Sequence, residues 1–479
     1  MYRRFRLKSS ILHGIEQKLL TDWNRKTLLA QPLSNSSIWI MKRFFQTRLL
    51  LQTGTLFLSE RASSTLSKGK KVSYKERLRS GVVDIKKDDA VELFQSMIVS
   101  RPLPTIIHFS RLFSSLAKTR QYELVLSLSK QMELHGVAHN NYTLNIMINC
   151  FSRRRKLGFA FSAMAKMLKL GYEPDTVTFS TLVNGLCLEG REGKHVEAKE
   201  LYYEMIARGI DPDTVTYNSL IYGLCMEKRL DEANQMLDVM VSKGCSPDSV
   251  TYNIIINGYC KAKRVEDGLK LFRKMSLREV VSYNTLVQGF CLSGKIEVAQ
   301  ELFREMVSRG VDPDTVTYNI LVDGLCENGK LEKALEIFED LQKSEMALDI
   351  GIFNIIIHGM CNGSMIDKAW ELFSSLAHKG VKADVKTYTI MIGGLCKKGS
   401  LSEADMLFRK MEEDGIAPNE CTYNTLIRAH LGGSGVATSV ELIEEMKRCG
   451  FSADASTMKM VIDMLSDGRL NKNLLGMLS

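Results

Sequence analysis

The feature that most constrains how this chain can fold is a motif that returns about every 35 residues. The octapeptide DPDTVTYN occupies residues 211–218 and recurs at 312–319, which is 101 residues later. Aligned on this motif, successive repeats begin at Thr176, Thr214, Ser249, Val280, Thr315, Ile350, Val385 and Glu420, with spacings of 38, 35, 31, 35, 35, 35 and 35 residues. Each repeat is then one structural unit that buries its apolar face only by stacking on its neighbours.

The same register extends in both directions and predicts the domain organisation. Earlier starts at Ile106 and Asn141 complete ten full repeats, flanked by a degenerate leading repeat at 71–105 and a partial C-terminal repeat at 455–479. The expected full repeats are 106–140, 141–175, 176–213, 214–248, 249–279, 280–314, 315–349, 350–384, 385–419 and 420–454.

Residues that recur within each repeat predict a pair of helices. The fourth residue is aromatic in nine of the ten full repeats, and apolar residues follow it at helical spacing. Glycine is the tenth residue in seven repeats. Because glycine is unfavourable inside a helix, we expect a neighbouring helix to approach closely there. A second amphipathic segment follows and ends in Gly-x-x-Pro-Asp or a variant, so the predicted fold is all-α, a superhelical solenoid of stacked helical hairpins.

The residues at one position of all repeats form a column of the alignment, and two columns have an alternative chemical interpretation. The aromatic column could be a stacking platform for bases, but its spacing places it between helices, so we predict core packing. Seven of the eleven cysteines also share one column, at Cys187, Cys225, Cys260, Cys291, Cys326, Cys361 and Cys396. They could suggest a metal site, but no C-x-x-C occurs, and we interpret them as small buried core residues. We therefore expect no metal and no cofactor, and the lack of clustered carboxylates argues against an enzyme.

The positive charge of the chain is concentrated in its first 70 residues. The chain has 64 Lys and Arg against 55 Asp and Glu, and residues 1–70 hold 13 of the basic and 3 of the acidic residues. The remaining 51 basic and 52 acidic residues leave the repeats close to neutral. The composition of 1–70 is typical of an organelle targeting presequence, with the mitochondrion as predicted destination and the plastid as alternative. The apolar run at 44–58 is too short for a membrane span, and either Met1 or Met41 could be the true start.

The stretch TVTYNSLIYGLCMEKRLDEANQMLDVMVSKGCSPD at 214–248 closely resembles the pentatricopeptide repeat. The segments YKERLRSGVVDIKKDDAVELFQSM and RPLPTIIHFSRLFSSLAKTRQ further resemble the restorer-of-fertility-like branch of plant P-type pentatricopeptide proteins. The resemblance implies a right-handed, monomeric solenoid that binds single-stranded organellar RNA, one base per repeat. It also implies a role in mitochondrial transcript processing, such as 5′ end definition, in stability or in expression. No DNA partner and no catalysis are implied, and a separate endonuclease is a candidate partner.

The resemblance also assigns roles to particular residues. In this family the fifth and last residues of a repeat face the base edge, and the second residue packs against the base plane. The base-reading pairs are then Ser110 with Asn140, Asn145 with Asp175, Ser180 with Asp213, Asn218 with Asp248, Asn253 with Glu279, Asn284 with Asp314, Asn319 with Asp349, Asn354 with Asp384, Thr389 with Asn419 and Asn424 with Asp454. The base-sandwiching residues are Ile107, Val177, Val215, Val250, Val281 and Val316. Read 5′ to 3′ along these pairs, the implied target resembles A-U-G-U-n-U-U-U-A-U.

Several repeats depart from the pattern, and one other class of function competes. Repeat 249–279 is four residues short, and 176–213 has three extra residues. Gly351, Lys386 and Cys421 replace the apolar second residue in consecutive repeats, so weaker reading is expected there. The competing hypothesis is a helical-repeat scaffold that binds a protein. The Asn, Ser and Thr of one column and the Asp and Asn of the other favour RNA, since a peptide groove gives no reason for them.

Overall fold

The computed structural model describes residues 85–189, 194–344, 346–433 and 435–466. Within these ranges every regular element is a helix, which confirms the all-α helical-repeat class. The expected presequence at 1–70, the start of the leading repeat and the last 13 residues of the partial repeat lie outside the described residues. None of the described helices is both long enough and apolar enough to cross a membrane.

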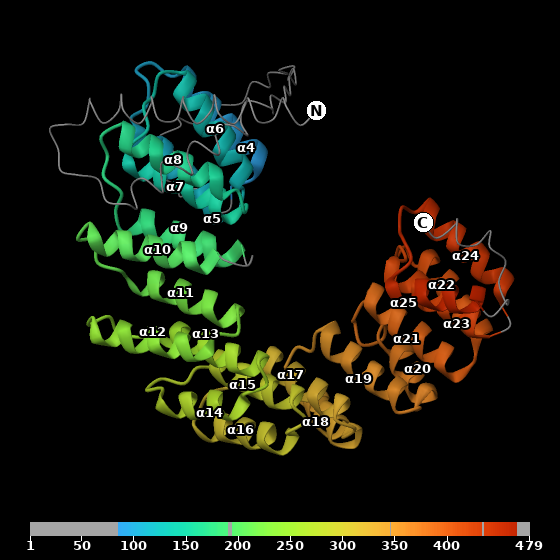
Figure 1. Cartoon of the computed structure of the whole chain (residues 1–479). Helices are drawn as coiled ribbons and strands as arrows, with labels where there is room; N and C mark the ends of the chain where they lie inside the picture. The colour runs from blue at the N-terminus through green and yellow to red at the C-terminus, as the bar shows by residue number, and fades with distance from the viewer. Residues whose placement is uncertain (1–84, 190–193, 345, 434, 467–479) are drawn as a thin grey trace. The chain divides into compact units, whose positions relative to one another are not determined.

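The described helices fall into two compact bodies, divided between Thr251 and Tyr252. The helices of the first body, drawn from blue to green in Figure 1, are α4 (Lys87–Val99), α5 (Ile106–Lys118), α6 (Tyr122–Leu134), α7 (Asn141–Arg153), α8 (Leu157–Lys169), α9 (Thr176–Glu189), α10 (Lys194–Ala207), α11 (Thr214–Met226) and α12 (Leu230–Ser242). Helix α13 (Ser249–Lys261) begins in the first body and continues into the second.

The second body, drawn from yellow-green to red, continues the same alternation. Its helices are α14 (Val265–Lys274), α15 (Val280–Leu292), α16 (Ile296–Ser308), α17 (Thr315–Glu327), α18 (Leu331–Lys343), α19 (Ile350–Asn362), α20 (Ile366–Ser375), α21 (Val385–Lys398), α22 (Leu401–Glu413), α23 (Glu420–Gly432), α24 (Val436–Arg448) and α25 (Ala455–Ser466). Each odd-numbered helix from α5 onward is the first helix of a repeat.

Within each body the helices form two layers. In the first body α7 packs against α8 of its own repeat and against α9 of the next, and α9 packs in turn against α11. In the second body the first helices α15, α17, α19, α21, α23 and α25 contact one another in that order. The first helices therefore make one layer of each body and the second helices make the other, as expected for stacked hairpins.

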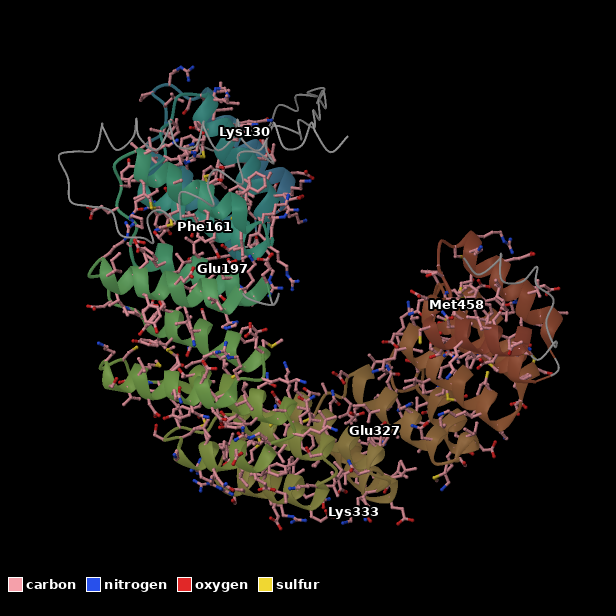
Figure 2. All side chains as sticks on the ribbon, viewed as in Figure 1. Lys130, Phe161, Glu197, Glu327, Lys333 and Met458 are labelled. Carbon is pink, nitrogen blue, oxygen red and sulfur yellow. The ribbon has the colours of Figure 1, made fainter. Side chains whose placement is uncertain are left out.

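The aromatic column lies in the core, as predicted. Phe109, Phe179, Tyr217, Tyr283 and Tyr423 are each at most 1% exposed. Several rings of the column meet an aromatic side chain of the preceding second helix edge to face, as in the pairs Phe272–Tyr283, Phe338–Phe353, Phe373–Tyr388 and Phe408–Tyr423. Figure 2 shows side chains filling the space between the helices of each body, with the buried Phe161 labelled in the first. The aromatic column is thus not a platform for bases.

The close approach expected at the tenth residue is also present. A Cβ built on Gly223 would lie 2.9 Å from Cys187 Sγ, in the first helix of the preceding repeat. Gly324 faces Cys291, and Gly394 faces Cys361, in the same way and more tightly. The cysteine column therefore packs against the glycine column of the next repeat, and burial raises the pKa of Cys291 to about 12. Within the described residues no group of three or more His, Cys, Asp or Glu could hold a metal ion.

Candidate nucleic-acid interface

The last residue of a repeat is the N-cap of the first helix that follows it. The Asp213 carboxylate accepts from the Thr216 backbone N–H at 2.8 Å, and Asp314 does the same with Thr317 at 2.8 Å. The same bond is made by Asn140, Asp175, Asp248, Asp349, Asp384, Asn419 and Asp454. Helix N-termini have unpaired N–H groups, which explains the Asp and Asn of this column. Glu279, in the short repeat, makes no such cap bond.

The structure brings the fifth residue to the last residue of the same repeat, about 30 positions later. The Nδ2 amide of Asn354 donates to Asp384 at 3.2 Å, where Asp384 also caps α21. Equivalent bonds join Asn145 to Asp175 at 3.1 Å, Asn218 to Asp248 at 3.4 Å and Asn284 to Asp314 at 3.4 Å. Four of the residue pairs chosen from the sequence are therefore direct neighbours.

Several of these asparagines are left with an unused acceptor. The side-chain carbonyl oxygens of Asn218, Asn253, Asn284, Asn319 and Asn354 are buried and have no hydrogen-bond partner among the described residues. An unpaired buried acceptor costs about 1–3 kcal/mol. The cost recurs at one position of five consecutive repeats, so it follows from the shared architecture of the repeats and calls for a common explanation.

The fold favours the ionised form of five capping aspartates: Asp175, Asp248, Asp314, Asp384 and Asp454. Burial alone raises the pKa of Asp248, Asp314 and Asp384, but the hydrogen bonds from the capped Thr and from the paired Asn outweigh it. The pKa of each therefore lies below its ordinary value. The pKa of Asp175 is lowered for the same reasons, whereas at Asp454 burial is outweighed by hydrogen bonds from Thr457 and Arg428. At neutral pH these side chains are acceptors only.

The second residue of a repeat points into solvent even when it is apolar. Ile107, Val177, Val215, Val250, Val281 and Val316 are each between 53% and 59% exposed. Tyr142 holds the same position in its repeat and is 54% exposed, although the sequence reasoning omitted it. Its place as the second residue of repeat 141–175 was the sequence signal that could have identified it. The structure thus leaves a series of apolar side chains uncovered, one in each of the first seven full repeats.

Other pairs are not joined directly. The hydroxyls of Ser110 and Ser180 donate to their own helix backbone, at Ile106 and Val177. Thr389 reaches Asn419 only through Thr422, whose hydroxyl lies 2.8 Å from that of Thr389 and 3.0 Å from Asn419 Oδ1. No hydrogen bond is described between Asn319 and Asp349 or between Asn253 and Glu279.

Known proteins share this repeat. The sequence profile described as PPR repeat family matches residues 144–188, 190–226, 212–261, 247–280, 278–327, 313–350, 348–397 and 390–432, and a second PPR repeat profile matches 421–451. Together these segments cover well over half of the chain.

The chain belongs to the PPR repeat family.

Plant PPR proteins are among its relatives. It is 58% identical over 152 residues to the putative pentatricopeptide repeat-containing protein At1g12700, mitochondrial, of Arabidopsis thaliana; the match covers 32% of this chain and 25% of that protein. It is 61% identical over 146 residues to At1g12300, mitochondrial, of the same plant, covering 28% and 23%. The matches thus span about a quarter of the length of these relatives. The mitochondrial designation of both agrees with the destination expected from residues 1–70.

A solved PPR structure shares the fold. The crystal structure of PPR10, a maize protein, in complex with an 18-nucleotide psaJ RNA element superposes with a TM-score of 0.65 and 23% sequence identity. The superposition covers 84% of this chain and 60% of PPR10. At this identity the comparison shows the fold alone.

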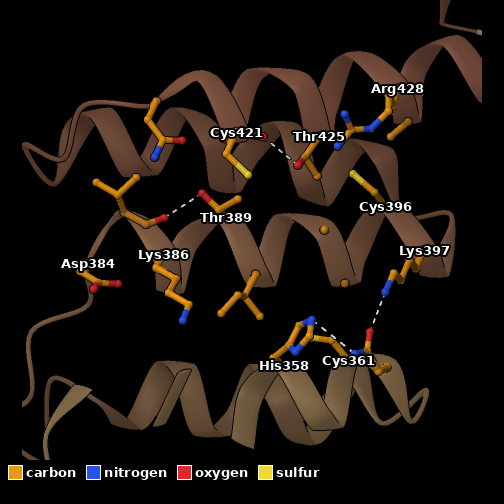
Figure 3. Close-up of a pocket in the computed structure, with 17 residues that line it drawn as sticks. His358, Cys361, Asp384, Lys386, Thr389, Cys396, Lys397, Cys421, Thr425 and Arg428 are labelled. Atoms are coloured by element: carbon orange, nitrogen blue, oxygen red, sulfur yellow. Dashed lines mark hydrogen bonds between the residues drawn. The ribbon is translucent and has the colours of Figure 1, made fainter. Parts of the chain in front are cut away.

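The PPR repeats that lack an apolar second residue line a cavity in the second body. The cavity has a volume of about 1000 Å³ and lies along α19, α21 and α23 (Figure 3). Lys386, Lys397 and Arg428 contribute positive charge to it, next to Thr389 and Asn419. Cys421, the second residue of its repeat, also lines it. Basic side chains in such a position are suited to a polyanion.

Proposed function

We propose that this PPR chain is a sequence-specific binder of single-stranded RNA in the mitochondrion, which reads one base per repeat without chemistry of its own. The observation that carries the proposal is the meeting of the fifth and last side chains across about 30 residues of sequence, as in Asn354 and Asp384. Bonded pairs also occur in repeats 141–175, 214–248 and 280–314, and there each pair accompanies an exposed second residue, Tyr142, Val215 or Val281. PPR10, a protein of the same fold, was crystallised in complex with an RNA element, which supports RNA as the ligand.

The Asn and Asp side chains suit the edge of uracil. The ionised Asp accepts a hydrogen bond, and the uracil N3–H can supply one. The Asn amide keeps a second N–H for a uracil carbonyl, and its unpaired carbonyl oxygen can turn toward a donor in the bound state. The ten base-reading pairs from Ser110 and Asn140 to Asn424 and Asp454 then favour A-U-G-U-n-U-U-U-A-U, read from the N-terminal repeat.

The exposed second residues would hold the base planes. Val281 and Val316 project at the starts of consecutive repeats, so a base can lie between them. Base stacking contributes about 1–3 kcal/mol per base, and ordering a flexible RNA removes much of the sum. A net free energy near −12 kcal/mol corresponds to nanomolar binding.

A protein that binds this tightly would act by covering its binding site on a transcript. A bound segment blocks nucleases or keeps a hairpin open, so a separate endonuclease could cut beside it. We propose that the chain acts in the definition of 5′ ends, in the stability or in the expression of a mitochondrial transcript. We also propose the restorer-of-fertility-like branch, the repeat boundaries given above, a presequence at 1–70 and a monomeric state.

A gel-shift with the full chain tests the proposal. The probe is AUGUUUUUAU in neutral flanking sequence, and the competitor has G at positions 6, 7 and 8, which face Asn284, Asn319 and Asn354. We expect tight binding to the probe and at least a tenfold loss on the competitor. Equal and weak binding to both RNAs would reject base reading and favour a protein-binding scaffold.

Cysteine alkylation gives an independent readout in the same sample. Cys421 and Cys449 are both exposed in the same repeat, but only Cys421 lines the cavity. Bound RNA should slow alkylation of Cys421 and leave Cys449 unchanged as the internal control. Equal rates at Cys421 with and without RNA would place the RNA elsewhere.

A further inference from the structure

The last full repeat, 420–454, bonds its two reading side chains differently from the four repeats in which Asn donates directly to Asp. Asn424 is 1% exposed, and its Nδ2 donates to the backbone carbonyls of Glu420 at 2.8 Å and Ser452 at 3.4 Å. Its Oδ1 accepts from the backbone N–H of Asp454 at 3.0 Å. Asn424 thus holds the local backbone and donates nothing to the Asp454 carboxylate.

Asn354 shows the contrast in the same body. It is 2% exposed, so burial does not separate the two residues. Its Nδ2 donates to the Asp384 carboxylate at 3.2 Å, and its Oδ1 has no partner among the described residues. Asn354 can therefore rearrange toward a ligand without breaking a bond at its oxygen, whereas Asn424 cannot.

In this repeat an arginine, and not the asparagine, donates to the carboxylate of the last residue. Arg428 Nη1 lies 2.7 Å from Asp454 Oδ2 and 3.1 Å from the Thr457 hydroxyl. Asp454 Oδ1 already caps α25 through the Thr457 N–H at 2.7 Å, so both carboxylate oxygens are engaged. In the described part of the chain, no cation pairs with Asp248, Asp314 or Asp384.

Arg428 reaches this place because it follows Asn424 by four residues on α23. Residues four apart lie on one face of a helix. Arg428 is the ninth residue of its repeat, and none of the other nine full repeats has an arginine there. Its side chain is 33% exposed and lines the cavity (Figure 3), so it stays partly accessible to a ligand there.

We propose that Arg428 replaces the Asn–Asp pair as the group that faces the tenth base, so that repeat 420–454 does not select uracil. The inference rests on the proposed function of the array. A guanidinium has only donors, and it suits a base edge with two acceptors, as guanine presents with O6 and N7. The tenth position is then read by a donor group, and a guanine there binds at least as tightly as a uracil.

The wild-type chain and three RNAs test the inference. The reference carries U at positions 8 and 10, and the other two carry G at one of these positions. We expect G at position 8, facing Asn354 and Asp384, to weaken binding at least tenfold, and G at position 10 to change it less than twofold or to strengthen it. An equal loss at both positions would overturn the inference alone. Indifference at both would overturn the proposed function, and this inference with it.

Two variants test the role of Arg428 itself. Arg428→Leu removes the partner of Asp454, and it should produce at least a fivefold preference for U over G at position 10. Lys397→Met is the matched control, because Lys397 lines the same cavity but donates to Asn362 at 2.6 Å. It should weaken all three RNAs alike and leave their ratios unchanged. Thermal melts establish that both variants fold, and an unchanged ratio in folded Arg428→Leu would reject the role of Arg428.

Discussion

At the scale of single residues, the last side chain of each repeat has a structural task that is independent of any RNA. Asp384 accepts from the Thr387 N–H and hydroxyl, both at 2.8 Å, and from Asn354 at 3.2 Å. Loss of an N-cap typically costs about 1 kcal/mol. A substitution that removes base reading at this position therefore also weakens the helix that follows, and binding losses need a stability control.

The lowered pKa values of the capping aspartates predict how the stability of the fold depends on pH. Their pKa values are lowered in the fold, so their contribution is present above the ordinary carboxyl pKa of 3.8 and is lost as the pH falls through the folded values. We expect the free energy of unfolding, measured with denaturant, to decrease progressively below about pH 4 because these carboxyls then bind protons. Asp384→Asn keeps a capping oxygen that does not titrate, so its loss below that pH should be smaller. An identical acid profile would show that Asp384 contributes nothing.

At the scale of helices, the glycine and cysteine columns set how closely neighbouring repeats approach. A Cβ atom added at Gly324 would clash more severely with its neighbours than one added at Gly223. The one at Gly223 meets Cys187 Sγ at 2.9 Å and Cβ at 3.3 Å, whereas the one at Gly324 meets the Cβ of Cys291 itself at 2.6 Å. A sulfur can rotate away more easily than a Cβ can move, so the two positions tolerate alanine differently.

Alanine substitutions should follow this order. Overpacking a core costs about 1–3 kcal/mol, and we expect Gly324→Ala near the upper end and Gly223→Ala near the lower end. Adding Cys187→Ala to Gly223→Ala should recover part of the loss. Gly393→Ala is the control, since its Cβ would meet only Thr425 Cγ2 at 3.6 Å, and it should gain up to about 1 kcal/mol as a helix substitution. Denaturant unfolding measures all four proteins, and equal losses at 223, 324 and 393 would contradict the packing argument.

At the scale of the whole molecule, the array is a series of contacts between neighbours. Helix α17 packs against α15 and α19 of the adjacent repeats. In such a structure stability is approximately a sum of repeat and interface terms. A destabilising substitution in one repeat should therefore weaken that repeat and its direct neighbours and leave distant repeats unchanged.

Hydrogen exchange measures this locality. In Gly324→Ala we expect faster amide exchange in α15, α17 and α19, with α5 to α8 of the first body unchanged as the internal control. Exchange that accelerates equally in all helices would show that the chain unfolds as one cooperative unit.

The sequence by itself determined the elements of this protein and their register. Apolar spacing, the capping Asp and Asn, and the glycine that ends most hairpins all act within a few residues. A single repeat such as 350–384 therefore already specifies its two helices. Stacking followed, because such a hairpin cannot bury its apolar faces alone. The core aromatic and cysteine columns were predictable for the same reason.

Only the tertiary structure decided which side chains meet between the first helix of a repeat and its last residue. By type and spacing, Asn424 with Asp454 looks the same as Asn354 with Asp384. Their bonding differs because Arg428 reaches Asp454 and Asn424 turns to the backbone. Hydrogen-bond partners about 30 residues apart are chosen by a few ångströms of packing geometry, and a periodic sequence pattern carries no information at that precision.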